Sequence, residues 1–262
     1  MKRAFAAAMA TTTLVAMAAG TAQAETALGL TGDRTLVWID TTTATVTGSV
    51  EVQGVDRLLG LDLRPINGTV IGVTGDQTIV TIDPKTGATT ELSQMNTMLP
   101  VGDATVIVDV NPAADRLRFM SGLVNHRVNM DTGEVTVDGE LNFDAADANA
   151  GKTPMVAASA YTNSHAKPES TAMYDVDVGL GALLRQTKPN DGTLATIGML
   201  DVAMDGPIAL DVATTADGTN TTWVAAGGML HTVDLETGAL TGSWTITGLD
   251  GALRDLTILP AM

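Results

Sequence analysis

The sequence predicts an all-β fold, and more specifically a five-bladed β-propeller. Three observations carry this expectation. Segments recur with a period of about 45 residues, each period holds four strand-like stretches, and one C-terminal strand lacks a partner of its own. Charged residues make up 17% of the chain, Gly and Thr are frequent, and long amphipathic helix patterns are hard to find. A two-sheet β-sandwich also uses short strands with frequent turns, and it is the alternative.

The chain begins with a segment typical of a secretory signal peptide. The basic pair Lys2 and Arg3 precedes an Ala-rich apolar stretch, which ends in the small-x-small pattern Ala22–Ala24. The apolar run is too short and too rich in alanine to favour a membrane anchor. We therefore expect residues 1–24 to be removed, residues 25–262 to form one propeller domain, and the protein to be periplasmic or extracellular.

Composition narrows the range of partners. The formal net charge is −16, and removal of the two basic N-terminal residues makes it −18. Such a surface repels nucleic acid and anionic lipid, and it attracts cations. The chain has no Cys, so an exported fold would use neither disulfides nor thiol chemistry. We expect a monomer with no nucleic-acid partner and no membrane insertion.

A hairpin motif recurs along the chain: an apolar strand, an acidic or amide residue, and a Thr-Gly turn into the next strand. The aligned acidic or amide residues are Asp40, Asp83, Asn129 and Asp234. Their spacings are 43, 46 and 105 residues, the last spanning two periods with one irregular copy between. Asp and Asn side chains accept backbone N–H bonds in such turns. Glycine supplies the positive φ that closes three of them, at Gly87, Gly133 and Gly238. These aspartates are therefore predicted to be turn residues rather than a site.

The strand pairs that precede these turns complete the blades. The N-terminal segment supplies three strands, at 27–32, 35–40 and 44–49. Complete blades follow at 57–92, 105–137, 155–197 and 208–244. The orphan strand at 253–260 resembles the first strand of a blade. We therefore expect it to pair with the N-terminal strands, which closes the ring and protects both edges.

The irregular blade at 155–197 carries the longest polar loops, where a propeller often places binding residues. In the loop before it, Asp144, Asp147 and Asn149 match part of a calcium-binding loop pattern. Calcium is thus a candidate ligand and no other cofactor is evident, although we favour a solvated acidic loop. His165, in the loop within the blade, is a candidate for ligand contact.

The first strands of the blades share a repeated carboxylate. The equivalent position holds Asp62, Asp109, Asp211 and Asp255 in four blades, and in the irregular blade Ala160, near Tyr161 and Asn163. Because the first strand of a propeller blade is innermost, these residues should form a ring around the axis. We favour a structural ring that accepts backbone N–H groups of adjoining loops or blades. The alternative is an axial pocket for a cation or a polar ligand, with Tyr161 and Asn163 filling the gap.

Three arginines share strand faces with other charged residues. Arg64 lies two residues after Asp62, so both side chains point to the same face, and Arg64 is not repeated in the other blades. In an axial site it would neutralise or select the ligand. Arg116 and Arg118 also share a face, and we expect them to make surface ion pairs.

Several longer segments resemble a known family. They are "GLDLRP", "NPAADRLRF", "DANAGKTPMVAASAYTNS" and "AMYDVDVGLGALLRQTKPNDGTLATIG". They are similar to hallmarks of the exported bacterial domain-of-unknown-function 4394 family, and the resemblance covers about residues 27–259. It implies an exported, propeller-like protein without an established role, and it transfers no catalytic residues.

The sequence thus favours a binding or scaffolding module for a small polar ligand, a cation or an envelope protein. One alternative is a hydrolase or lyase with an axial site, in which Asp62 or Asp109 is the base and Arg64 pairs with an oxyanion or carboxylate. Another is a purely structural surface protein. The chain has neither a Gly-x-Ser-x-Gly nucleophile elbow nor a complete phosphate-binding loop, so we favour binding over catalysis.

Overall fold

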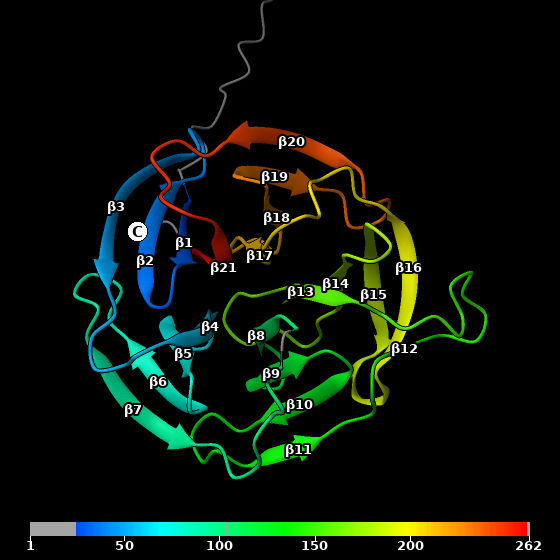
Figure 1. Ribbon diagram of the computed structural model, residues 1–262, viewed down its shortest axis with the longest axis horizontal. Helices are drawn as coiled ribbons and strands as arrows, with labels where there is room; N and C mark the ends of the chain where they lie inside the picture. The colour runs from blue at the N-terminus through cyan, green and yellow to red at the C-terminus, as the bar shows by residue number, and fades with distance from the viewer. Residues whose placement is uncertain (1–24, 103, 261–262) are drawn as a thin grey trace, which may run out of the picture.

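The computed structural model describes residues 25–102 and 104–260, and the predicted signal peptide lies outside them. The described residues form five sheets arranged around a central axis (Figure 1). The predicted all-β, five-bladed propeller is confirmed. The part of the chain that the structure describes contains no helix long and apolar enough to cross a membrane.

Each blade is an antiparallel meander that starts at the axis. Blade 1 consists of β21 (Leu253–Leu259), β1 (Thr26–Thr31), β2 (Thr35–Asp40) and β3 (Thr45–Glu51). Blade 2 consists of β4 (Leu58–Arg64), β5 (Thr69–Thr74), β6 (Thr78–Ile82) and β7 (Thr89–Gln94). Blade 3 consists of β8 (Val106–Asn111), β9 (Arg116–Ser121), β10 (Val124–Val128) and β11 (Val135–Val137).

The last two blades differ in complexity. Blade 4 consists of β13 (Val156–Tyr161), β14 (Met173–Asp177), β15 (Ala182–Lys188) and β16 (Thr193–Met199). It gains a short fifth strand, β12 (Asn142–Phe143), parallel to β16, and a 3-10 turn, η1 (Pro189–Asp191). Neither addition belongs to the repeat, so neither was expected from the sequence. Blade 5 consists of β17 (Ile208–Thr214), β18 (Asn220–Ala226), β19 (Met229–Val233) and β20 (Leu240–Thr245).

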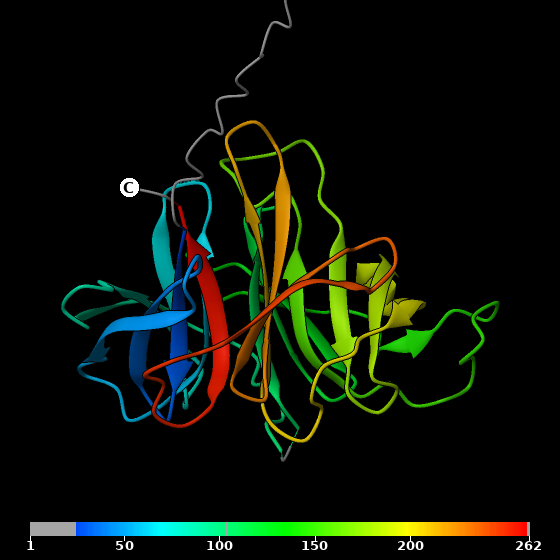
Figure 2. The same cartoon turned by 90° about the horizontal axis from the view of Figure 1, so that it is seen from above.

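The two ends of the chain close the ring in blade 1. β21 pairs antiparallel with β1, so that Ile258 lies opposite Ala27. This is the predicted closure, and it leaves no free inner edge. The five innermost strands all end at one face, which we call the upper face. The β17–β18 hairpin and the β13–β14 loop project from this face (Figure 2).

The core lies between neighbouring blades. Phe119 and Leu117 of blade 3, for example, pack against Ile71 and Ile79 of blade 2. Innermost strands are covered on both faces, which is why their sequences read as nearly continuous apolar runs. The outermost strands alternate between exposed and half-buried residues, as in β3.

The repeated turns have the predicted chemistry. Asp40 Oδ1, for example, accepts the N–H groups of Thr42 and Thr43 at 2.9 Å each. The three turn glycines have φ values of 72° at Gly87, 72° at Gly133 and 76° at Gly238. In the copy without glycine, Ala44 takes the same left-handed conformation, with φ at 50°.

These turns also join the blades at the rim, which the sequence did not reveal. The carbonyl of Gly87 accepts the N–H of Gln53 from the end of blade 1, at 2.8 Å. The carbonyl of Gly133 accepts the N–H of Asn96 from the end of blade 2, at 3.0 Å. Each turn therefore packs directly against the backbone of the preceding blade.

We predict that Gly133→Ala destabilises the fold strongly. A Cβ at this position would lie 1.9 Å from the carbonyl oxygen of Gln94, so the rim contact must open. The expected loss is about 3 kcal/mol in the free energy of unfolding, measured by urea titration. Gly218→Ala is the matched control, because Gly218 also has a positive φ, 85°, but no heavy atom within 4 Å of the added Cβ. It should cost only about 1 kcal/mol. Equal losses would contradict the rim contact.

Candidate functional site

The axial carboxylates join successive blades. Each accepts a backbone N–H from the innermost strand of the next blade: Ile258 N to Asp211 Oδ2 at 2.5 Å, Leu61 N to Asp255 Oδ2 at 2.8 Å, Val110 N to Asp62 Oδ2 at 2.7 Å and Tyr161 N to Asp109 Oδ1 at 3.1 Å. This is the structural role that we favoured, in its inter-blade form.

The junction between blades 4 and 5 is built differently. Ala160 occupies the equivalent position and offers no acceptor. The β13–β14 loop supplies the contacts at the upper face instead. Asn163 N donates to Asn220 Oδ1 at 2.9 Å, and Ser164 N donates to Thr214 Oγ1 at 2.8 Å. Asn163, a predicted ligand residue, thus holds the loop against blade 5.

The carboxylates also converge. One oxygen from each of Asp62, Asp109 and Asp211 lies within 4.8 Å of the other two, and all three residues are buried. Burial, followed by the charge of Asp211, raises the pKa of Asp62 well above its usual range. Burial and the neighbouring carboxylates do the same for Asp109. Such a group is stable only when it keeps protons or when a cation neutralises it.

Burial also raises the pKa values of the other two axial carboxyls. Burial raises the pKa of Asp211 to about 6, and it raises that of Asp255 to about 7. Below the ring the axis is nearly filled, because the cavity beside Asp255 and Ser159 measures only about 10 Å³. A ligand therefore has no room on that side.

A larger cavity, of about 220 Å³, opens on the upper face, and we call it the axial pocket. Its walls include Leu63, Ala213 and Ile258, from the innermost strands of three blades, and the β13–β14 loop covers part of it. Leu63 N and Ile258 N donate to Asp62 and Asp211. The carboxylate ring therefore begins directly below these walls.

Two ionisable side chains line the axial pocket. His165 lies exposed on the β13–β14 loop, so the structure places this candidate at a cavity. Glu25 is half-buried, and burial raises its pKa. Nothing in the sequence marked Glu25, since it precedes the first strand and belongs to no repeat.

Arg64 does not face the axial pocket. Its guanidinium holds Asp115 through two bonds of 2.8 and 2.6 Å and Asp131 through two of 2.8 and 3.1 Å. The hydrogen bond to Asp115 has the largest effect on the pKa of Arg64, followed by the one to Asp131, and both raise it. Both carboxylates belong to blade 3, so Arg64 fastens blade 2 to blade 3 at the upper face. This explains why the residue is not repeated.

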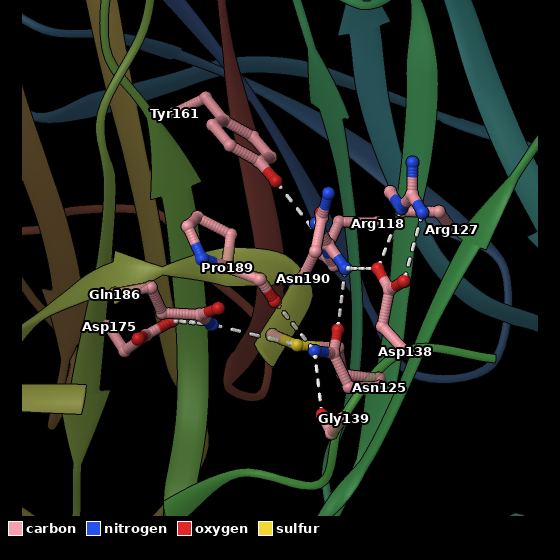
Figure 3. A network of polar contacts seen from close by, with 11 residues as sticks. Arg118, Asn125, Arg127, Asp138, Gly139, Tyr161, Asp175, Gln186, Pro189 and Asn190 are labelled. Carbon is pink, nitrogen blue, oxygen red and sulfur yellow. Dashed lines mark hydrogen bonds and ion pairs between the residues drawn. The ribbon is translucent and has the colours of Figure 1, made fainter. Parts of the chain in front are cut away.

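The expectation of a surface ion pair is wrong for Arg118. Arg118 makes no surface ion pair, because only 1% of its side chain is exposed. It bridges blades 3 and 4 instead. Its partners are Tyr161 Oη at 3.1 Å, Asn125 Oδ1 at 2.7 Å, Asp138 Oδ2 at 2.7 Å and Asn190 Oδ1 at 3.2 Å (Figure 3). Tyr161 therefore points into this interface, where its hydroxyl meets Arg118.

The acidic loop before blade 4 is anchored to β16. Asp147 Oδ2 accepts the backbone N–H of Thr196 at 2.6 Å, and Asp147 Oδ1 accepts the Thr196 hydroxyl at 3.0 Å. Asn149 Nδ2 also donates to that hydroxyl, and Asp144 Oδ1 accepts the N–H of Ala146. Calcium binding by this loop stays a prediction.

Several solved structures are similar to this chain, and the one with a TM-score above 0.5 supports the fold. A protein of unknown function from Bacteroides thetaiotaomicron is 15% identical over 92% of this chain and 68% of its own, with a TM-score of 0.52. One from Bacteroides caccae is 12% identical over 87% and 75%, with a TM-score of 0.44. An auxiliary nutrient binding protein from Bacteroides thetaiotaomicron is 9% identical over 73% and 53%, with a TM-score of 0.43.

Sequence comparison gives the classification. No curated protein matches the chain. A family model does, over residues 35–257, and its description is "Domain of unknown function (DUF4394)". The match spans most of the five blades and agrees with the resemblance found in the sequence. The chain therefore belongs to the DUF4394 family of proteins with a domain of unknown function.

Proposed function

We propose that the protein is an exported binding module that holds a small ligand, with an apolar body and a cationic group, in the axial pocket. The observation that carries this proposal is the position of the pocket. It lies at the mouth of the propeller axis, and residues from four blades line it. Loops carried by a rigid scaffold are common sites of recognition.

The lining of the pocket supports a ligand of mixed character. Leu63, Ile66 and Ile258 offer apolar surface, while Glu25 offers a partly desolvated carboxylate. Mostly apolar walls with a few polar groups are typical of small-molecule sites. The net charge of −18 expected for the processed chain adds a field that favours cations.

The volume limits the size of the ligand. At about 220 Å³ the axial pocket is smaller than the range of about 300–1,000 Å³ that is typical of drug-sized ligands. A short alkylammonium-like molecule suits this volume. The narrow space below the ring gives no room for a longer one.

The alternatives draw less support from the geometry. A hydrolase or lyase that uses Arg64 would need a free guanidinium, and Arg64 holds two carboxylates of blade 3. Asp62 and Asp109 accept inter-blade backbone bonds. A purely structural role does not call for a pocket at the axis. Catalysis and a structural role both stay predictions.

One observation favours a second ligand, a divalent cation. Three carboxylates converge within 4.8 Å at the axis, directly below the pocket walls. Carboxylate oxygens are the ligands that calcium prefers. A cation there would replace the protons that the ring otherwise keeps.

We predict that butylammonium binds and that butyrate, its anionic counterpart of similar length, does not. Isothermal titration calorimetry on the chain without residues 1–24 provides the measurement. Glu25→Gln should weaken butylammonium binding about tenfold, the loss expected for a charge-assisted hydrogen bond. Glu236→Gln removes the same charge from an exposed turn and is the control. Equal binding of butylammonium and butyrate would contradict the proposal. Equal effects of Glu25→Gln and Glu236→Gln would contradict it as well.

We predict that thermal stability falls as pH rises from 5 to 8. The folded-state pKa values of the ring carboxyls lie above the ordinary value of 3.8, so the native state binds more protons than the unfolded state in this range. Between the unfolded and the folded pKa of each such carboxyl, the free energy of unfolding falls by up to about 1.4 kcal/mol per pH unit. Asp109→Asn, which keeps an acceptor for Tyr161 N, should flatten the decline.

The same measurement tests the cation. If the ring binds calcium, millimolar calcium at pH 8 should raise the unfolding midpoint by about 5 °C. Asp109→Asn should then abolish the rise, while Asp144→Asn should leave it unchanged. A rise lost only in Asp144→Asn would place calcium in the acidic loop. If calcium does not raise the unfolding midpoint, both the axial cation site and the acidic-loop site are wrong.

A further inference from the structure

A second cavity, of about 380 Å³, lies between blades 3 and 4, and we call it the Arg118 cleft. Blade 3 contributes Asn111 and Arg118. The end of β15 contributes Lys188, and the turn after it contributes Asn190 and Asp191. None of these residues lines the axial pocket. The cleft is therefore a separate feature, and a ligand site there is independent of the proposed function.

Positive charge exceeds negative charge around the Arg118 guanidinium. Asp138 accepts hydrogen bonds from two guanidinium groups, Arg118 Nη1 at 2.7 Å and Arg127 Nε at 2.7 Å. Figure 3 shows this carboxylate between the two arginines. One carboxylate cannot neutralise both guanidinium groups. Arg127 is partly exposed, so water screens part of its charge, whereas Arg118 is buried and shares this carboxylate.

The other carboxyl of this interface does not pair with Arg118. Asp175 is fully buried, and its Oδ1 accepts from Ser159 and from Gln186, the latter at 3.1 Å. Its Oδ2 has no partner among the described residues. Burial raises the pKa of Asp175 to about 7, so this group carries at most part of a negative charge at neutral pH.

Arg118 has one donor to spare. Of its five N–H groups, Nε binds Tyr161, Nη1 binds Asn125 and Asp138, and Nη2 binds Asn190. The second N–H of Nη2 has no hydrogen bond to any described residue. The Asn190 bond is also the longest of the set, at 3.2 Å, and Asn190 is exposed on its turn.

We propose that the Arg118 cleft binds the carboxylate group of a small ligand. A carboxylate oxygen takes the place of the Asn190 amide oxygen at Nη2 and also accepts the unused N–H. Charge-assisted bonds of this kind are stronger than the neutral bond they replace. Lys188, exposed at the rim, supplies a second positive charge.

The negative charge of the whole protein does not forbid such a site. At physiological ionic strength the Debye length is about 8 Å, so distant carboxylates are largely screened. Within the cleft the negative group at the rim is Asp191, which is exposed. The surplus of Arg118, Arg127 and Lys188 over Asp138 and Asp191 therefore decides the sign of the ligand.

The test is a titration with sodium malonate at constant ionic strength, balanced with sodium chloride, on the ¹⁵N-labelled chain without residues 1–24. The Nε–Hε signal of Arg118 should shift saturably, and chloride alone should not shift it. A shift that tracks ionic strength rather than malonate would overturn the proposal.

Variants locate the binding. Lys188→Gln should raise the Kd about two- to fivefold. Arg185→Gln is the matched control, because Arg185 lies on the same strand and is exposed but stacks on Tyr174 outside the cleft. Asn190→Ala removes the competing amide oxygen, so it should bind at least as tightly as the parent chain. These surface changes avoid the buried Arg118, whose loss would unfold the interface. Equal weakening by Lys188→Gln and Arg185→Gln would refute the assignment.

Discussion

Four of the five blade junctions depend on one interaction, a buried carboxylate at the axis that accepts a backbone N–H from the next blade. The innermost strand of each blade has neighbours on both sides that belong to different sheets, so its side chains must provide the contacts between sheets. Apolar packing alone fixes neither register nor rotation. A directed hydrogen bond does both, and it also satisfies the carboxylate, which would otherwise be costly to bury.

Much of this architecture could be predicted from the sequence because its signals are local and repeated. Each blade carries its own Asx turn, and the copy at Asp40 was recognisable even though Ala44 replaces glycine. The orphan strand at the C-terminal end had only one place to pair. The alignment of first strands found Asp62, Asp109 and Asp211, since equivalent positions in a closed ring meet at the axis. It was wrong for Asp255, because Thr257 occupies the equivalent position in blade 1 and Asp255 lies two residues before it.

The rest depends on partners far apart in the chain. Arg64 binds Asp115 and Asp131, which lie 51 and 67 residues away, and no repeat points to either. The burial of Arg118 was missed because the period-2 rule gives a face but does not say what covers that face. Glu25 precedes the first strand and belongs to no repeat. The alignment of the innermost strands does not show that Leu63, Ala213 and Ile258 border a cavity. The one usable signal was the irregular blade, whose long loop does reach the pocket.

Blades 2, 3 and 5 have aspartate at the position that Ala160 occupies in blade 4, and blade 1 has Thr257 there. Ala160 leaves the junction between blades 4 and 5 without an axial carboxylate. At that junction the axial bond is missing. An exposed bond from Asn163 N and a partly buried bond from Ser164 N replace it. Exposed hydrogen bonds open at lower free energy than buried ones. The same loop carries His165 over the axial pocket. Local opening of the propeller should therefore concentrate at the loop that covers the axial pocket. The least stable blade junction is then also the route by which a ligand reaches the axis.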